Sequence, residues 1–140
     1  MTEKQTLSQE GNIRFSHMMV GSNDLDRSKT FYDALFIALG GRAGRVDPKG
    51  RLLYLHAGSI FLVTTPIDGQ PATPANGATI GFAVDGPAQG DAWHAAGVAA
   101  GGTAIEDAPG IRSTPMGDLY LAYLRDPDGN KLCALHRIVA

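Results

Sequence analysis

The sequence has 140 residues, with 12 Lys and Arg against 14 Asp and Glu, and a formal net charge of −2. A chain of this length can bury a hydrophobic core as one domain without disulfides. The charge balance excludes the strongly basic surface of a nucleic-acid binder and gives no reason to expect a membrane partner. Cys133 is the only cysteine, and no apolar run approaches the roughly 20 residues of a membrane span. We therefore expect a cytoplasmic protein with a flexible leader at residues 1–12.

The first half of the chain predicts a strand, a helix, a short edge strand and a hairpin. Asn23 and Asp24 offer side-chain oxygens that can cap the N-terminus of a helix, and Gly40-Gly41 can end it. Between these residues, apolar side chains recur at helical spacing. Strand-like runs lie at residues 14–20, 42–47, 52–56 and 60–64.

The same order of elements begins again after a linker rich in proline and glycine at residues 66–77. Pro87 suits the first turn of a second helix, Gly101-Gly102 can end it, and its apolar stripe places Trp93 in the core. We expect a loop at residues 106–117 and strands at residues 79–84, 103–105, 119–124 and 131–135. Matching elements are offset by about 61 or 62 positions, which favours a duplicated unit. The alternative is an α/β chain that alternates strands and helices without duplication.

Two segments carry a recognisable pattern: residues 15–20 (FSHMMV) with residues 24–32 (DLDRSKTFY), and residues 126–132 (DPDGNKL). Together they resemble the vicinal oxygen chelate superfamily, which includes glyoxalase I, the bleomycin-resistance proteins and the extradiol dioxygenases. The resemblance covers residues 13–138 and implies an α+β fold of two βαβββ modules. It implies that the strands form a curved mixed sheet around a concave pocket, with the helices on the convex face. Module one would span about residues 13–65 and module two residues 78–138, and a homodimer is expected.

In metal-using relatives four ligands lie on the concave face, and the resemblance maps them onto His17, Leu62, Thr79 and Cys133. Side chains alternate along a strand, so if Leu62 and Cys133 face the pocket, their neighbours face the helices, where apolar residues belong. Leucine offers no lone pair and threonine only a neutral hydroxyl, which makes a poor site for a divalent metal. We therefore expect no cofactor; any metal would be held by His17 and Cys133.

We expect the pocket to bind a small, mostly apolar molecule through Phe15, His17, Met19, Leu62, Thr79, Cys133 and Arg112. His17 could be a general base, hydrogen-bond a ligand, or only bond a neighbour. Cys133 could be a thiolate beside a cationic His17, or a small buried apolar residue. Arg112, in the predicted loop, could clamp a carboxylate or phosphate, or remain solvated.

Two functions follow from these residues. The first is a binding protein similar to the bleomycin-resistance proteins, although no acidic cluster for a cationic drug is evident in the sequence. The second is a glyoxalase-like lyase or isomerase that uses His17 as base or as metal ligand. Metal-dependent glyoxalase I activity is disfavoured by the poor donor set.

Overall fold

The computed structural model describes residues 14–139, so the leader predicted at residues 1–12 lies outside the described residues. Module one contains β1 (Met18–Gly21), α2 (Leu25–Ala38), β2 (Arg45–Val46), β3 (Leu52–His56) and β4 (Ser59–Thr64). Module two contains β5 (Ile80–Ala83), α3 (Pro87–Ala99), β6 (Thr103–Ala104), β7 (Gly110–Thr114), β8 (Gly117–Arg125) and β9 (Lys131–Arg137). The fold is α+β, as the sequence predicts. No helix in residues 14–139 is long and apolar enough to span a bilayer.

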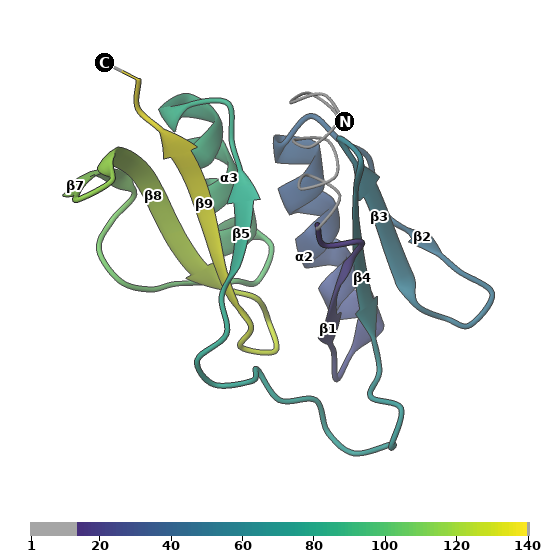
Figure 1. The fold of residues 1–140 in the computed structure, drawn as a ribbon. Coiled ribbons are helices and arrows are strands. Elements are labelled where there is room, and N and C mark those ends of the chain that lie inside the picture. The colour runs from purple at the N-terminus through teal and green to yellow at the C-terminus, as the bar shows by residue number, and fades with distance from the viewer. Residues whose placement is uncertain (1–13, 140) are drawn as a thin grey trace, which may run out of the picture.

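Each module has its own sheet, and the two sheets repeat one topology (Figure 1). The strand order is β1-β4-β3-β2 in module one and β5-β9-β8-β6 in module two, where β7 also pairs with β8. The pairs β1–β4 and β5–β9 are parallel, and the others are antiparallel. The short strands β6 and β7 together therefore occupy the position that β2 has in module one. This repetition is what the duplicated pattern of the sequence predicts.

Two local predictions differ from the structure. The first strand begins at Met18 and not at residue 14. The loop predicted at residues 106–117 contains β7, which pairs with β8 from Gly110↔Leu121 to Thr114↔Gly117. A strand of Gly, Ile, Arg, Ser and Thr shows little apolar alternation, so its pairing with β8 could not be read from its own sequence.

Both helices begin as their capping residues predict. Asp24 is extended, and its Oδ1 accepts a hydrogen bond from the Arg27 N–H at 3.1 Å. Gly40, which follows the C-cap residue Leu39 of α2, has a φ of +82°, a left-handed conformation that glycine adopts without strain. Pro87 opens α3, and Trp93 is fully buried in its predicted core position.

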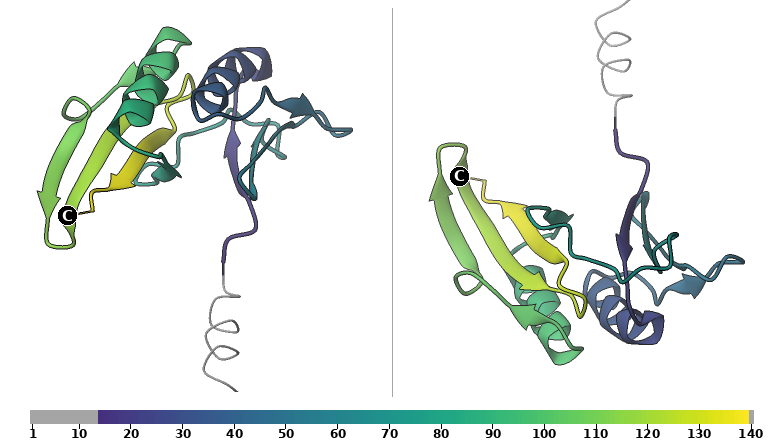
Figure 2. Two further views of the ribbon diagram at one scale, coloured as in Figure 1. Left: turned by 90° about the horizontal axis from the view of Figure 1, so that it is seen from above. Right: turned by 90° about the horizontal axis from the view of Figure 1, so that it is seen from below.

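The two helices pack against each other, so both modules share one core (Figure 2). A Cβ at Gly97 of α3 would lie 3.0 Å from Leu35 Cδ2 of α2, which shows how closely the helices approach. The ring of Phe82 on β5 lies 5.7 Å from that of Phe61 on β4 and 5.8 Å from that of Trp93. The core therefore runs unbroken from one module to the other. Because side chains alternate, the opposite face of each sheet, called the outward face below, points away from this core.

Candidate functional site

The four predicted positions fall into two pairs, one on each outward face. In module one, Met19 pairs with Leu62 across β1 and β4, and His17 lies at the alternate position before Met19. In module two, Gly81 pairs with Cys133 across β5 and β9, and Thr79 lies at the alternate position before Gly81. The register thus has the alternation expected from the sequence. It also places Leu62 and Cys133 on different sheets.

A hollow of about 430 Å³ between the starts of β1 and β5 brings three of the predicted residues together. Its lining includes Phe15, His17, Met18, Ile60, Thr79 and Ile80. His17 Nδ1 lies 2.8 Å from Ser16 Oγ, and this contact leaves Nε2 as the ring nitrogen available to a ligand. The hollow therefore combines apolar walls with an imidazole and a hydroxyl.

A second hollow of about 480 Å³ adjoins the first and shares its residues Met18, Ser59, Ile60, Ile80 and Gly81. It extends to the core aromatics Phe36, Phe61 and Phe82 and to the polar residues His56, Asp85 and Gln89. Sequence reasoning missed Met18 and Ile60. Both are apolar residues at strand positions, and apolar side chains that stay exposed there indicate a binding surface. Met18 is 39% exposed and Ile60 38%. Apolar walls with a few polar groups are typical of small-molecule sites.

Leu62 lies in β4 and Cys133 in β9, and neither residue lines the hollow at His17. Burial raises the pKa of the Cys133 thiol, and the lowering effect of the neighbouring Tyr123 hydroxyl is smaller. Cys133 Sγ donates a hydrogen bond to the Ala134 carbonyl at 3.4 Å. The charge of Lys131 also lowers this pKa, but its effect is smaller than that of burial. These contacts favour a neutral, small buried residue over a thiolate nucleophile.

The donors at the predicted metal positions do not fit a divalent ion. Leu62 has no donor atom, Thr79 offers a neutral hydroxyl, and the raised pKa of Cys133 makes the thiolate ligand harder to form. His17 is then the only one of the four positions with a good ligand atom. Within residues 14–139, no group of three or more His, Cys, Asp or Glu side chains is placed to hold a metal ion.

Two further predicted residues, Arg112 and Phe15, have contrasting surroundings. Arg112 lies in β7 and not in a loop, and its Nη1 donates to the carbonyls of Gly110 and Leu121, each at 2.8 Å. Its Nη2 donates to the Asp107 carbonyl at 3.1 Å, so two of its five N–H groups remain for a ligand. Phe15 is 92% exposed beside the hollow at His17.

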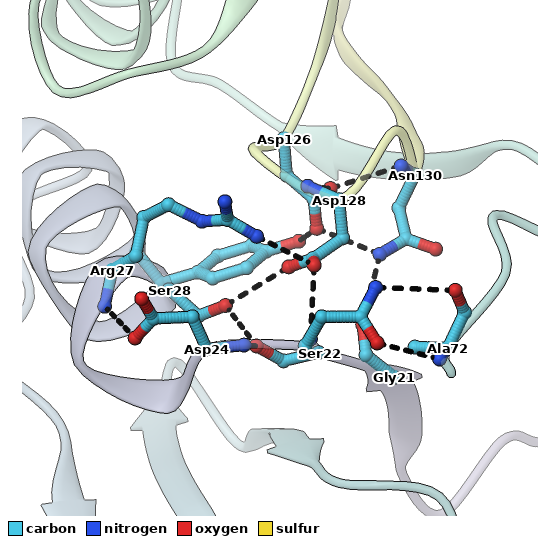
Figure 3. A network of polar contacts seen from close by, with 11 residues as sticks. Gly21, Ser22, Asp24, Arg27, Ser28, Ala72, Asp126, Asp128 and Asn130 are labelled. Carbon is cyan, nitrogen blue, oxygen red and sulfur yellow. Dashed lines mark hydrogen bonds and ion pairs between the residues drawn. The ribbon is translucent and has the colours of Figure 1, made fainter. Parts of the chain in front are cut away.

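A buried polar network joins the two modules and includes the turn at residues 126–130 (Figure 3). Tyr32 Oη, from α2, donates to Asp126 Oδ2 at 2.6 Å. Burial raises the pKa of Tyr32 well above its usual value, and the Asp126 carboxylate adds to the rise, so the phenol stays a donor. Asn130 Nδ2 donates to Asp126 Oδ2 at 2.8 Å and to the Gly21 carbonyl at 3.3 Å.

The same turn is held from the start of α2 by Asp128. Arg27 Nη2 lies 2.8 Å from Asp128 Oδ1, and Ser28 Oγ donates to Asp128 Oδ2 at 3.2 Å. The Asn23 N–H donates to Asp128 Oδ1 at 2.9 Å. We call residues Asn23, Arg27, Ser28, Tyr32, Asp126, Asp128 and Asn130 the inter-module clasp. It fixes one module on the other, which gives the turn a structural role.

Comparisons with known proteins agree with this architecture. A model of the glyoxalase/bleomycin resistance protein/dioxygenase superfamily matches residues 14–134. Among solved structures, a glyoxalase/bleomycin resistance protein from Albidiferax ferrireducens T118 is 58% identical, with a TM-score of 0.84 over 88% of this chain and 98% of that one. A search of curated proteins found no match.

Two more distant solved structures share the fold. A glyoxalase/bleomycin resistance protein/dioxygenase family enzyme from Burkholderia phytofirmans PsJN is 20% identical, with a TM-score of 0.68 over 88% of this chain and 98% of that one. A lactoylglutathione lyase from Agrobacterium tumefaciens is 21% identical, with a TM-score of 0.61 over 88% of this chain and 92% of that one. At these identities the similarity extends to the fold alone.

Proposed function

Because the chain belongs to the glyoxalase/bleomycin resistance protein/dioxygenase superfamily, we propose that it binds a small, mostly apolar molecule at the hollow beside His17. One observation carries this proposal: Phe15, His17 and Thr79, selected from the sequence, line one hollow of about 430 Å³. Met18 and Ile60 provide apolar surface there, while His17 and Thr79 provide the few hydrogen-bonding groups that orient a ligand.

In this proposal the metal site of the metal-using relatives is lost. The support is chemical, since Leu62 replaces a donor with a hydrocarbon and the Cys133 thiol has a raised pKa. A divalent ion needs several imidazole or carboxylate ligands, and His17 alone supplies one of them. Binding would then rest on apolar contact and hydrogen bonds rather than on coordination.

A homodimer would complete the proposed site. Met19, Leu55 and Leu135 lie on outward faces and are 41%, 51% and 39% exposed. The edge strands β1 and β5 are each hydrogen-bonded on one side only, and such edges favour association with another chain. A second copy would cover these surfaces and could set the His17–Leu62 face of one chain opposite the Thr79–Cys133 face of the other.

The ligand site can be tested with phenylnaphthylamine, a neutral apolar dye that fluoresces when it leaves water. We expect the purified protein to bind the dye and His17→Ala to weaken binding by roughly two- to tenfold, because a hydrogen bond to a neutral group contributes about 0.5–1.5 kcal/mol. The matched control is His136→Ala, since His136 bonds the Val84 carbonyl and lies outside the hollow. No dye binding, or equal affinities for wild type and His17→Ala, contradicts the proposal.

The dimer can be tested by sedimentation of Leu55→Glu. This change places a charge on the outward face of β3, and we expect the sedimenting mass to fall from two chains to one. Ile67→Glu is the control, because Ile67 is fully exposed in the linker and belongs to neither sheet. A wild-type protein that sediments as one chain at micromolar concentration contradicts the dimer.

A second candidate function is a lyase or isomerase with His17 as general base. It is favoured by the 2.8 Å contact between Ser16 Oγ and His17 Nδ1, which orients the imidazole and leaves Nε2 for a substrate proton. The test begins with mass spectrometry of the purified protein, to identify a compound that stays bound through purification. If that compound exchanges a carbon-bound proton with deuterated water in the presence of the protein, the exchange should stop in His17→Ala and slow in Ser16→Ala. Retained exchange in His17→Ala excludes this residue as the base.

A further inference from the structure

The basic residues of module two all lie on one face of its sheet. Residues 78–138 contain four of them: Arg112, Arg125, Lys131 and Arg137. In the strand register, Arg112 and Arg137 flank Leu119, and Arg125 pairs with Lys131. Tyr120 and Leu124 of β8 are buried in the core, so the residues that alternate with them, such as Leu119 and Arg125, face outward. Arg112 and Arg137 pair with Leu119, and Lys131 pairs with Arg125, so all four basic residues lie on this outward face.

Within residues 78–138, no strand position on this outward face carries an acidic residue. There are seven acidic residues in all: Asp85, Asp91, Glu106, Asp107, Asp118, Asp126 and Asp128. Only Asp118 lies within a strand, and its side chain is on the same side of β8 as that of the buried Tyr120, opposite the outward face. Glu106 reaches the face from its loop and pairs with Lys131. The outward face is therefore positive, although the whole chain carries a formal charge of −2.

Two of these cations are close enough to act on one group. Neighbouring strands are about 4.8 Å apart, so Arg112 and Arg137, one strand on each side of Leu119, have Cα atoms roughly 10 Å apart. Arg137 is exposed and forms no ion pair with any residue in 14–139. Arg112 is fixed by three backbone carbonyls and keeps two free N–H groups. Arginine side chains are long enough for two of them with Cα atoms at this spacing to reach a single anion.

The surface beside these arginines is apolar. Leu121 pairs with Leu135 next to the Arg112–Leu119–Arg137 row, and Tyr123 pairs with Cys133 beyond it. A molecule on this face would therefore contact hydrocarbon with its body and guanidinium groups with one end.

We propose that the molecule bound by this protein is an organic anion, with an apolar body and a carboxylate or phosphate group that Arg137 and Arg112 hold on the outward face of β7, β8 and β9. This inference rests on the proposed function and its dimer, in which the Thr79–Cys133 face that carries these arginines lies opposite the His17–Leu62 face of the second copy. It narrows the ligand of that joint site from a small apolar molecule to an apolar anion. Because Arg137 is exposed, its attraction for the anion should weaken as salt is added.

The experiment is competition against bound phenylnaphthylamine by four naphthalene compounds that differ in one substituent. They are naphthoate, naphthyl phosphate, the neutral naphthalenemethanol and the cationic naphthylmethylamine. We expect one or both anions to displace the dye at about tenfold lower concentration than the alcohol, and the amine to be weakest. The order of naphthoate and naphthyl phosphate distinguishes the two anionic groups. Raising the salt from about 0.1 to about 1 M should reduce the preference.

The residue assignment is tested with Arg137→Gln, which should reduce the anion preference to about two- to threefold without changing displacement by the alcohol. Arg42→Gln is the control, because Arg42 is an exposed arginine in the segment between α2 and β2, outside the sheet of module two. Arg137→Glu serves as a second variant and should reverse the preference. Thermal melts of all variants check folding.

The outcomes separate this inference from the function on which it rests. If the dye binds and the four competitors are equally effective, the anion inference is wrong and the apolar site stands. If the preference exists but Arg137→Gln and Arg137→Glu keep it, the assignment to this face is wrong. If the dye does not bind, the proposed function fails and this inference fails with it.

Discussion

Replacing Tyr32 with phenylalanine should weaken the attachment of one module to the other. The Tyr32 side chain is fully buried, and its hydroxyl donates to Asp126 Oδ2 at 2.6 Å across 94 positions of sequence. A hydrogen bond to a charged acceptor contributes about 1.5–3 kcal/mol. Asp126 would keep three other donors, the N–H groups of Asp128 and Asn130 and the Asn130 amide. We therefore expect the lower end, about 1.5 kcal/mol, which for 140 residues lowers Tm by roughly 5 °C.

A double-mutant cycle isolates this contact from the rest of the clasp. Asp126→Asn alone should lower the free energy of unfolding by about 3 kcal/mol, because it removes a buried charge that four donors contact. Combined with Tyr32→Phe, it should cost about 1–2 kcal/mol less than the sum of the two single changes. The assay is urea unfolding monitored by circular dichroism and fluorescence.

The control cycle pairs Asp126→Asn with Tyr120→Phe. Tyr120 is equally buried, but its hydroxyl donates to Asp91 at 2.8 Å and not to the clasp. This pair should be additive within about 0.5 kcal/mol. A coupling near zero for Tyr32 with Asp126, or one no larger than in the control, would refute the reasoning that this bond holds the modules together.

Three further changes test other parts of the structure. Gly90→Ala should destabilise the protein by about 1–3 kcal/mol in thermal melts, because a Cβ there lies 2.1 Å from the Tyr120 ring; Gly81→Ala, whose Cβ meets no atom within 4 Å, is the control and should show a much smaller loss. Burial raises the pKa of Asp33, but hydrogen bonds from Lys29, Gly44 and Tyr54 outweigh it and hold the pKa below its usual value. The stability that this shift contributes is present above about pH 4 and lost as pH falls through the lowered pKa, so the deficit of Asp33→Asn at pH 7 should shrink below about pH 4; a constant deficit contradicts this. The buried Cys133 thiol, with its raised pKa, should react with iodoacetamide at least about tenfold more slowly in folded than in urea-unfolded protein, and equal rates would contradict its burial.

Several features of this protein were determined by local sequence. Asp24 caps α2, Pro87 opens α3 and Trp93 lies in the core, because capping and helical periodicity depend on residues only a few positions apart. The repeated order of elements likewise comes from a pattern along the chain. The side chains of Leu62 and Cys133 are on the face of the sheet opposite to those of their neighbours in the strand, and the two-residue period of a strand is enough to predict this.

Other features were decided only by tertiary contacts. Strand β7 exists because β8 supplies its partners, and Arg112 is held by carbonyls that pairing with β8 brings near it. The contact between Tyr32 and Asp126 joins segments far apart in sequence, and no pattern within either segment shows it. Most important for function, α2 packs against α3, so the outward faces of the two sheets point away from a shared core. Local periodicity tells which side chains share a face, but only the packing of one module on the other decides what that face meets.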